Sequence, residues 1–507
     1  MRKTLKVALV NPRVESYSSV LPPLGLLYIA AVLEKAGHQV GVFDVYPYDD
    51  RTLPQIAAQE PDVVGMTVLT DYWPRARHVA AYIRREIPQA TFLIGGVHVT
   101  TMPEESLTEL AADAAVLGEG EQTMGEVCDR LRQGAAWTDV PGLMVRDASG
   151  AFSRTPPRAY IENLDELPFP ARHMLSFEQY LVPPGFIRGR WSERSTTVIT
   201  SRGCPFLCIW CASQCVFGRR VRRRSVDNVL EELDHLVNRY RIDTVWFIDD
   251  TFTLNKQWVM DFCRRMQARG TRLVWGCQAH IRTADEEMFS AMKQAGCVQL
   301  DFGVESGSDK VLKALKKNSD AESVREAFRI AKKVGIRTMA TFMFGSPEEG
   351  PEDVKATMRL ARQIRPDFAS SFFITPYPGT ELMKMAEENH WPLHCAPGQT
   401  GLKKTPPLTI RFSARELQEF RARFQKMFIW RNYVRALLRP HILLRAAWLA
   451  IRYPIGLAWG VRKFLKTLVL DDLFFEFLIY YVKERTRQMQ KLASTARRGA
   501  GRGGEAS

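Results

Sequence analysis

Three cysteines stand close together in the chain, at Cys204, Cys208 and Cys211, with the spacing Cys-x3-Cys-x2-Cys. Thiolates are the ligands that iron–sulfur clusters use, normally four of them. Three thiolates leave one iron open, and an open coordination position is what a catalytic metal site keeps for its substrate. The triad therefore predicts an iron–sulfur cluster with one free iron. The alternative is a structural zinc site with Cys215 as the fourth ligand, although zinc sites usually pair two two-ligand knuckles.

Acidic residues and glycines follow other predicted strands in the same part of the chain. Asp249-Asp250, Glu305-Ser306 and Gly345 each come directly after an apolar run of strand length. In a (β/α) barrel the functional loops gather at the carboxyl ends of the strands. We therefore expect these residues to lie at the same edge as the cysteines, although each one taken singly also fits a solvated loop acid or a turn glycine.

Two glycine-rich loops occur in the first 130 residues. One contains Gly95, Gly96 and His98, and the other contains Gly118 and Gly120. Ligands of open parallel sheets sit beyond the carboxyl ends of the strands, and glycine lets the backbone approach a ligand closely. These loops are the candidate ligand-binding loops of the N-terminal part.

The elements that position the N-terminal loops are short buried strands that alternate with helices. The predicted strands are Val7–Val10, Val40–Asp44, Val63–Thr67, Phe92–Ile94 and Ala114–Leu117. This alternation predicts an α/β domain over residues 1–135 with a doubly wound, Rossmann-like parallel sheet. Residues 136–190 are predicted to form a connector that contains a small hairpin at 145–154.

A second alternating series occupies residues 191–400. Its predicted strands are Thr197–Thr200, Thr244–Ile248, Leu273–Gln278, Gln299–Gly303, Thr338–Phe344 and Ala369–Ile374, with helices between them. Six strands with crossover helices predict a partial (β/α)6 TIM-type barrel. A helical C-terminal region is expected at 401–483, and a disordered tail at 484–507 because that segment is rich in charge and glycine.

Composition narrows the class of protein. The 507 residues include nine cysteines and carry a net charge of +14. We expect the cysteines to be thiols in a reducing cytoplasm, since no secretion signal is recognisable. A basic balance is compatible with nucleic acid, anionic membrane or acidic partners and does not choose among them.

The cysteine triad, its place after the first barrel strand and Trp210 before its last cysteine resemble the radical S-adenosylmethionine superfamily. The resemblance implies that a 4Fe–4S cluster binds the amino and carboxylate groups of S-adenosylmethionine and breaks its sulfonium bond to give a 5′-deoxyadenosyl radical. It implies a cofactor contact at each of the loops after the barrel strands: Asp249, Asp250, Glu305, Ser306 and Gly345.

The N-terminal part is similar to the cobalamin-binding domain that precedes many radical S-adenosylmethionine enzymes. The similarity rests on residues 22–37 and on the two glycine-rich loops. It implies that Gly95, Gly96, His98, Gly118 and Gly120 contact cobalamin. The Asp-x-His-x-x-Gly motif of other cobalamin modules is absent, so the lower cobalt ligand stays unassigned, with His98 as one candidate.

Together the two resemblances imply a cobalamin-dependent radical enzyme, most simply a methyltransferase that acts on an unactivated carbon. Family members with other outcomes are an anaerobic oxidative cyclase and lipid-remodelling enzymes. A non-catalytic cobalamin or redox sensor would not need the open iron. A tRNA- or peptide-modifying enzyme would normally carry an added RNA-binding barrel or a further cysteine-rich domain. An electron donor such as flavodoxin or ferredoxin is expected as a partner.

The region 431–482 combines Arg and Lys with Trp, Phe and Leu. Its apolar runs are interrupted before they reach the roughly 18 residues that a membrane-spanning helix needs. Basic residues beside apolar helix faces favour a helix that lies in the membrane interface, and the alternative is a helical cap packed on the barrel. We therefore expect a hydrophobic lipid or tetrapyrrole substrate and peripheral contact with the inner face of the membrane. Nucleic acid is a less favoured partner.

Overall fold

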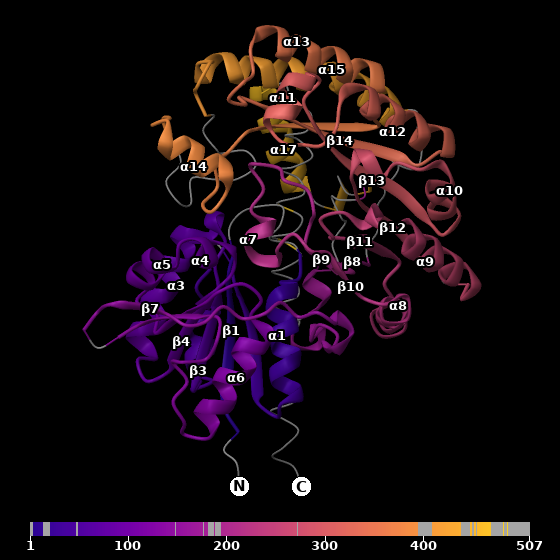
Figure 1. Cartoon of the computed structure of the whole chain (residues 1–507). Helices are drawn as coiled ribbons and strands as arrows, with labels where there is room; N and C mark the ends of the chain where they lie inside the picture. Colours follow the sequence, from indigo (N-terminus) through magenta and orange to yellow (C-terminus); the bar gives the residue numbers. More distant parts are fainter. Residues whose placement is uncertain are drawn as a thin grey trace.

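The chain was analysed as a computed structural model (Figure 1). The structure describes residues 4–13, 21–46, 49–147, 149–175, 177–180, 187, 194–270, 272–393, 408–437, 447–448, 451–452, 454–467, 480 and 484. Cys395, the side chains of Arg431 and Arg435, all of Arg439, and the predicted tail beyond Glu484 lie outside these residues.

The N-terminal sheet has seven strands in the order β2-β1-β3-β4-β5-β6-β7. The strands are β1 (Lys6–Pro12), β2 (Gln39–Val45), β3 (Val63–Thr67), β4 (Thr91–Gly95), β5 (Ala114–Val116), β6 (Leu143–Arg146) and β7 (Phe152–Arg154). Strands β1 to β5 are parallel, which confirms the predicted doubly wound sheet. The helices are α1 (Leu24–Lys35), α2 (Leu53–Ala57), α3 (Trp73–Glu86), α4 (Val97–Thr101), α5 (Pro103–Leu110) and α6 (Glu121–Arg132).

The hairpin β6–β7 departs from the expectation of a separate connector at 136–190. Strand β6 pairs antiparallel with β5, so the hairpin extends the N-terminal sheet. The physical reason is the apolar face of β6, because Leu143, Met144 and Val145 are all buried and pack into the cores of the N-terminal sheet.

The second sheet has six parallel strands in the order β15-β14-β13-β12-β11-β8 and does not close, which confirms the predicted partial barrel. Its strands are β8 (Ser195–Val198), β11 (Thr244–Phe247), β12 (Val274–Ala279), β13 (Cys297–Glu305), β14 (Arg337–Phe344) and β15 (Phe368–Phe373). A short antiparallel pair, β9 (Ser201–Arg202) and β10 (Arg222–Arg223), follows β8. Every residue of β8 and β11 is buried, as is usual for parallel strands covered on both faces.

The helices of the barrel begin at polar capping residues. Asp320 forms a capping box with Ser323 at the start of α12, and Ser225 accepts from the Asn228 N–H at the start of α8. The helices are α7 (Ser213–Phe217), α8 (Val226–Tyr240), α9 (Lys256–Ala268), α10 (Glu286–Gln294), α11 (Asp309–Ala314), α12 (Ala321–Val334), α13 (Pro351–Ile364) and α14 (Glu381–Glu388).

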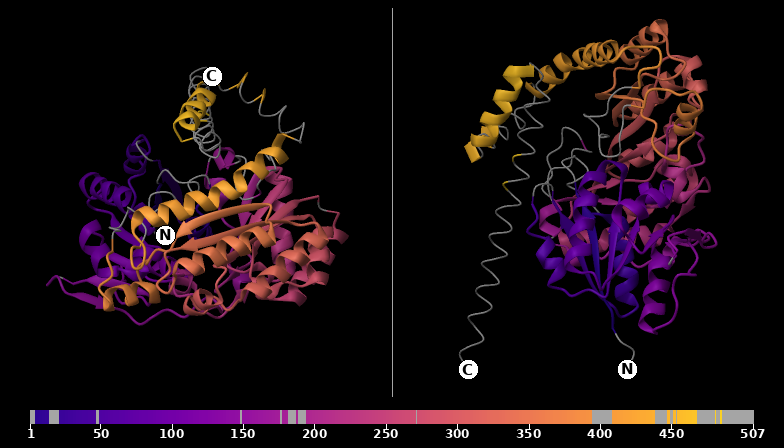
Figure 2. Two further views of the ribbon diagram at one scale, coloured as in Figure 1. Left: turned by 90° about the horizontal axis from the view of Figure 1, so that it is seen from above. Right: turned by 90° about the vertical axis from the view of Figure 1, so that its left-hand side faces the viewer.

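Two further helices form the C-terminal region, α15 (Ala414–Leu437) and α17 (Pro454–Thr467). Helix α15 covers the β15 side of the open barrel, where Phe424 packs against Phe342 and Phe344 with ring centroids 4.9 and 5.8 Å apart. Figure 2 shows α15 lying along the sheet and α17 turned away from it. Helix α15 therefore caps the barrel, and its packing lies ahead of the region 431–482 for which a helical cap was one of the two alternatives.

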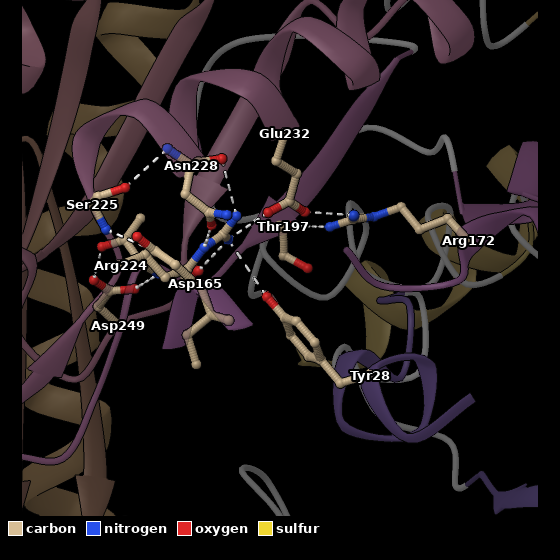
Figure 3. A network of polar contacts seen from close by, with 11 residues as sticks. Tyr28, Asp165, Arg172, Thr197, Arg224, Ser225, Asn228, Glu232 and Asp249 are labelled. Atoms are coloured by element: carbon tan, nitrogen blue, oxygen red, sulfur yellow. Dashed lines mark hydrogen bonds and ion pairs between the residues drawn. The ribbon is translucent and has the colours of Figure 1, made fainter. Parts of the chain in front are cut away.

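A buried ion network joins α8 of the barrel to α1 of the N-terminal domain (Figure 3). Glu232 of α8 accepts hydrogen bonds from Arg172 and Arg224, and the side chains of all three residues are at most 3% exposed. The Arg224 guanidinium also lies 3.5 Å from the Tyr28 hydroxyl of α1 in the N-terminal domain. Burial opposes the charge of Glu232, but the two arginines more than offset it, so its pKa is lowered.

We predict that Glu232→Gln lowers the free energy of unfolding by roughly 3–5 kcal/mol at neutral pH, because two buried arginines lose their counter-charge. Urea unfolding measures this free energy in the wild type and in the variant. Glu231→Gln, at the exposed neighbouring position, serves as the control and should change the free energy by less than about 0.5 kcal/mol.

The same pair of variants has a predicted pH dependence. The pKa of Glu232 is depressed in the folded chain, so its stabilisation is present above the unfolded value of about 4.3 and is lost as pH falls through the lower folded pKa. The difference between wild type and Glu232→Gln should therefore narrow in acid. Equal losses in the two variants, or a difference that widens in acid, contradict this account.

Candidate active site

The three cysteines lie on the loop between β8 and α7, which we call the cysteine loop (residues 200–212). Cys204, Cys208 and Cys211 are half-buried free thiols. Burial raises the pKa of each thiol, that of Cys208 to about 11. A metal binds thiolates and not thiols, so metal binding must release the protons of these cysteines. The free energy needed to remove the protons lowers the net free energy of metal binding.

The arrangement of the thiols bears on the zinc alternative. Within the described residues, no three side chains of His, Cys, Asp or Glu are grouped in a way that suits one metal ion. A zinc ion needs its four ligands around one centre. An iron–sulfur cluster binds each thiolate at a different iron and so accepts more widely separated thiols.

Asp249, at the carboxyl end of β11, fixes the start of the cysteine loop. Its carboxylate is buried and accepts from the Thr200 N–H at 2.6 Å, from the Thr200 hydroxyl and from the Ser201 hydroxyl at 2.8 Å. Because these bonds occupy both oxygens, the structure places Asp249 in the support of the loop and not in an open position for a cofactor.

The middle of the cysteine loop rests on the far side of the barrel. Phe206 stacks on His280 with ring centroids 3.6 Å apart, and the Ile209 N–H donates to the Leu315 carbonyl at 3.3 Å. His280 is buried, and burial lowers its pKa to about 3, so the stacked ring is neutral. The loop is thus held from two sides by residues of the barrel.

The other residues expected to contact S-adenosylmethionine fall into two groups. Asp250 accepts from the Ser213 hydroxyl and interacts electrostatically with Cys204 and Cys211, and burial raises its pKa. Glu305 interacts electrostatically with Cys208 and pairs with Lys317 at 3.2 Å. The structure therefore brings Asp250 and Glu305 together with the thiols.

Ser306 and Gly345 serve internal contacts instead. The Ser306 hydroxyl accepts from the Ser308 N–H and lies 3.1 Å from the Thr357 hydroxyl. The Gly345 N–H donates to Glu349, whose pKa burial raises to about 7. Gly345 has φ +89°, which favours glycine at this turn.

The first glycine-rich loop of the N-terminal domain is shaped by close packing. A Cβ on Gly96 would lie 2.7 Å from the Val68 carbonyl, and its φ is +102°. His98 is fully buried, 4.5 Å from the Trp73 ring and 3.2 Å from the Thr70 hydroxyl. Burial lowers the pKa of His98 to about 4, so its ring is neutral and packed within the domain.

The second glycine-rich loop binds the cysteine loop through a buried ion cluster, which we call the loop clamp (Glu119, Glu121, Arg202 and Arg222). Arg202 donates to Glu119 at 2.8 Å and to Glu121 at 2.6 Å, and Arg222 reaches Glu119 at 2.7 Å. All four side chains are at most 5% exposed. Arg202 stands two residues before Cys204, so the clamp ties the first cysteine to the N-terminal sheet.

Helices α4 and α7 pack against each other beside the loop clamp, so the carboxyl edges of both sheets meet there (Figure 1). The Cys215 thiol of α7 donates to the Gly379 carbonyl at 3.3 Å. The sequence analysis missed Arg202, Arg222 and Lys317. The run Glu119-x-Glu121 and the arginines that flank the cysteine loop were visible, but nothing in their spacing paired them across about 80 to 100 residues.

Comparisons with known proteins agree with the two-domain reading. The Radical SAM superfamily model matches residues 198–361, and the B12 binding domain model matches residues 10–128. The uncharacterized methyltransferase PH0819 of Pyrococcus horikoshii is 36% identical over 402 residues, covering 76% of this chain and 84% of that protein. The anaerobic magnesium-protoporphyrin IX monomethyl ester cyclase of Rubrivivax gelatinosus is 28% identical, covering 75% of this chain and 70% of that protein.

One solved structure shares the fold over most of its length. It is the radical S-adenosylmethionine methyltransferase TsrM from Kitasatospora setae, with cobalamin and a 4Fe–4S cluster bound. The TM-score is 0.65 at 22% identity, and the match covers 82% of each chain.

We predict that Arg202→Met loosens both halves of the loop clamp together, because it leaves Glu121 buried without its ion pair to Arg202. Hydrogen exchange should accelerate roughly tenfold or more at residues 118–121 and at 201–204. Arg219→Met, at an exposed position just after α7, is the control and should leave the exchange rates of both segments unchanged. Faster exchange in only one of the two segments would show that the clamp does not couple them.

Proposed function

The chain belongs to the family of cobalamin-dependent radical S-adenosylmethionine methyltransferases, and we propose that it methylates an unactivated carbon of a hydrophobic substrate. When bound, the 4Fe–4S cluster, S-adenosylmethionine and cobalamin supply the electron, the radical and the methyl group. The chain itself holds these groups next to one another and keeps water away.

The observation that carries the proposal is the loop clamp. Arg202 joins the cysteine loop to Glu119 and Glu121, which flank Gly120 in the glycine-rich loop of the N-terminal domain. A methyl group can pass between two cofactors only if the loops that hold them stay in register. A buried ion cluster between those two loops provides such a register.

Individual residues have distinct proposed roles. Cys204, Cys208 and Cys211 hold the cluster. Asp250, half-buried beside two of the thiols, fits the amino group of S-adenosylmethionine. Glu305 pairs with Lys317 through Oε1 and has Oε2 to offer a ribose hydroxyl. We retain Gly95, Gly118 and Gly120 as backbone contacts for cobalamin, while Gly96 and His98 shape the loop beneath.

Helix α17 supports a hydrophobic substrate at a membrane surface. Five apolar side chains are 54–82% exposed: Trp448 and Ile451, which precede α17, and Ile455, Trp459 and Leu465 of α17. Tyr480 packs on α17 at Gly456, where an added Cβ would lie 2.4 Å from its ring, and its ring centre lies 6.5 Å from that of Trp459. No described helix has the length and hydropathy to cross a bilayer. An exposed apolar row beside Arg452, Arg462 and Lys463 suits the interface of an anionic membrane.

The same charge balance fits an acidic electron donor. The net charge of +14 would attract a small acidic redox protein such as flavodoxin or ferredoxin. We accordingly propose a cytoplasmic protein that works on the inner face of the membrane.

Oxidative cyclisation is the second candidate function, and one relative, the cyclase of Rubrivivax gelatinosus, favours it. Methylation and cyclisation share the radical step and differ in the product. A non-catalytic sensor is disfavoured because Asp250 and Glu305 lie with the thiols in the arrangement that a cofactor site needs.

We predict that the protein, reconstituted anaerobically with iron, sulfide and cobalamin, forms 5′-deoxyadenosine from S-adenosylmethionine and a reductant. Cys208→Ala should lower the yield at least about 100-fold, because the cluster loses one of its three thiolates. Cys215→Ala is the matched control and should retain the yield. No 5′-deoxyadenosine from fully loaded wild type would overturn the proposed function.

We also predict that the protein binds vesicles of mixed neutral and anionic phospholipid through α17. The double variant Ile455→Glu with Leu465→Glu should weaken binding roughly tenfold or more, because two exposed apolar side chains of α17 become charged. Leu393→Glu, at an exposed apolar position outside α17, should bind as wild type does. Vesicle sedimentation measures this, and equal binding by all three proteins would remove the case for membrane contact.

A further inference from the structure

A buried ion pair lies under the cysteine loop. Glu305, at the end of β13, and Lys317, just after α11, are 3.2 Å apart, and their side chains are 9% and 10% exposed. Burying two charges costs more free energy than an isolated pair usually returns. A buried pair therefore needs a reason for its position, and support of the fold is a weak one.

The backbone around the pair is strained in a way that serves it. Glu305, Lys316 and Asn318 all have positive φ, at +66°, +51° and +55°. Such a conformation costs about 1 kcal/mol or more for a residue with a side chain. Gly303 completes the arrangement, because a Cβ there would lie 2.2 Å from the Glu305 Oε1 and 2.7 Å from the Lys317 Nζ.

The pair reaches the cysteine loop through several contacts. The Lys317 Nζ lies 5.7 Å from the centre of the Trp210 ring. Trp210 stands between Cys208 and Cys211 in the sequence. The Lys317 carbonyl lies 3.2 Å from His280 Nε2, and that ring stacks on Phe206. The segment 315–317 therefore contacts the middle of the cysteine loop at Ile209 and Trp210.

The charge of Lys317 affects the pKa of all three thiols, and that of Glu305 affects the pKa of Cys208. Burial raises the pKa of Cys208. Lys317 is the strongest influence that lowers this pKa, and Glu305 raises it by a smaller amount. Lys317 also lowers the pKa of Cys204 and of Cys211. The Lys317 Nζ also lies over the Trp210 ring of the cysteine loop, so the cation of the pair contacts the loop directly.

We propose that the Glu305–Lys317 pair sets the reduction potential of the iron–sulfur cluster, an inference that rests on the proposed function. Reduction adds one negative charge to the cluster. A buried cation nearby stabilises that charge and a carboxylate destabilises it, and both effects are strong where water is excluded. The two members of the pair therefore push the potential in opposite directions.

The test is a redox titration of the reconstituted cluster in the absence of S-adenosylmethionine. Electron paramagnetic resonance measures the fraction of reduced cluster at each potential. Lys317→Met should lower the potential and Glu305→Gln should raise it. Each shift should change the ratio of reduced to oxidised cluster at a fixed potential about tenfold, which is ~59 mV for one electron. Lys316→Met, at the adjacent half-exposed lysine, is the matched control and should leave the potential unchanged.

A merely structural pair gives a different result. It would lower cluster loading in both variants and would not move the potentials in opposite directions. Shifts of the same sign, or none, in loaded variants overturn the inference. If Lys317→Met does not take up the cluster, Glu305→Gln and Lys317→Arg decide the question. A raised reduction potential in Glu305→Gln together with an unchanged one in Lys317→Arg supports the inference. Any other pair of results overturns it.

Iron and sulfide per chain are measured first in the wild type, so that two failures can be told apart. A wild type that takes up no cluster sinks the proposed function. A loaded wild type with unmoved variant potentials sinks only the inference about Glu305 and Lys317.

Discussion

The loop clamp is the interaction on which the rest of the site depends. Arg202 and Arg222 meet Glu119 and Glu121 away from water, and such charges are stable only as a complete set. Losing one member leaves the others buried and unpaired. The two domains are consequently held in one arrangement at the point where the glycine-rich loop meets the cysteine loop. The Glu232 network makes a second such junction between α8 and α1.

The cysteine loop is shaped by groups on three sides. Asp249 holds its start, His280 and the Leu315 carbonyl hold its middle, and the loop clamp holds it to the N-terminal domain. The thiols themselves make few of these contacts and stay available for metal. A loop fixed before the cluster binds needs less ordering when it does bind, which is how a protein prepares a site for a reactive cofactor.

The sequence predicted most of the fold because buried parallel strands and capped helices have local signatures. Helices were expected between the strands of the second series, and α8, α12 and α13 lie there; Asp320 and Gly335 at the ends of α12 are ordinary cap residues. The hairpin at 143–154 was placed outside the N-terminal sheet because pairing with β5 is a tertiary event. The cysteine triad was predicted as the cluster site from its spacing and from its place after the first barrel strand, both of which are local features of the sequence.

The supporting residues could not be predicted in the same way. Arg202 and Glu119 are 83 residues apart, and only the packing of two domains pairs them. Asp249, Ser306, Gly345 and His98 stood in the right loops, yet their side chains or N–H groups turn inward to hydrogen bonds and packing. Loop position is encoded by the strands, whereas the direction of a side chain in that loop depends on its neighbours in space.

The most direct test of the account is the separation of the two cofactors in the loaded enzyme. With the cluster reduced and the cobalamin in its paramagnetic Co(II) form, pulsed electron paramagnetic resonance measures the dipolar coupling between them. The account predicts one narrow distance distribution, because the loop clamp holds the cysteine loop against the glycine-rich loop. A broad distribution, or no coupling in fully loaded protein, would contradict it.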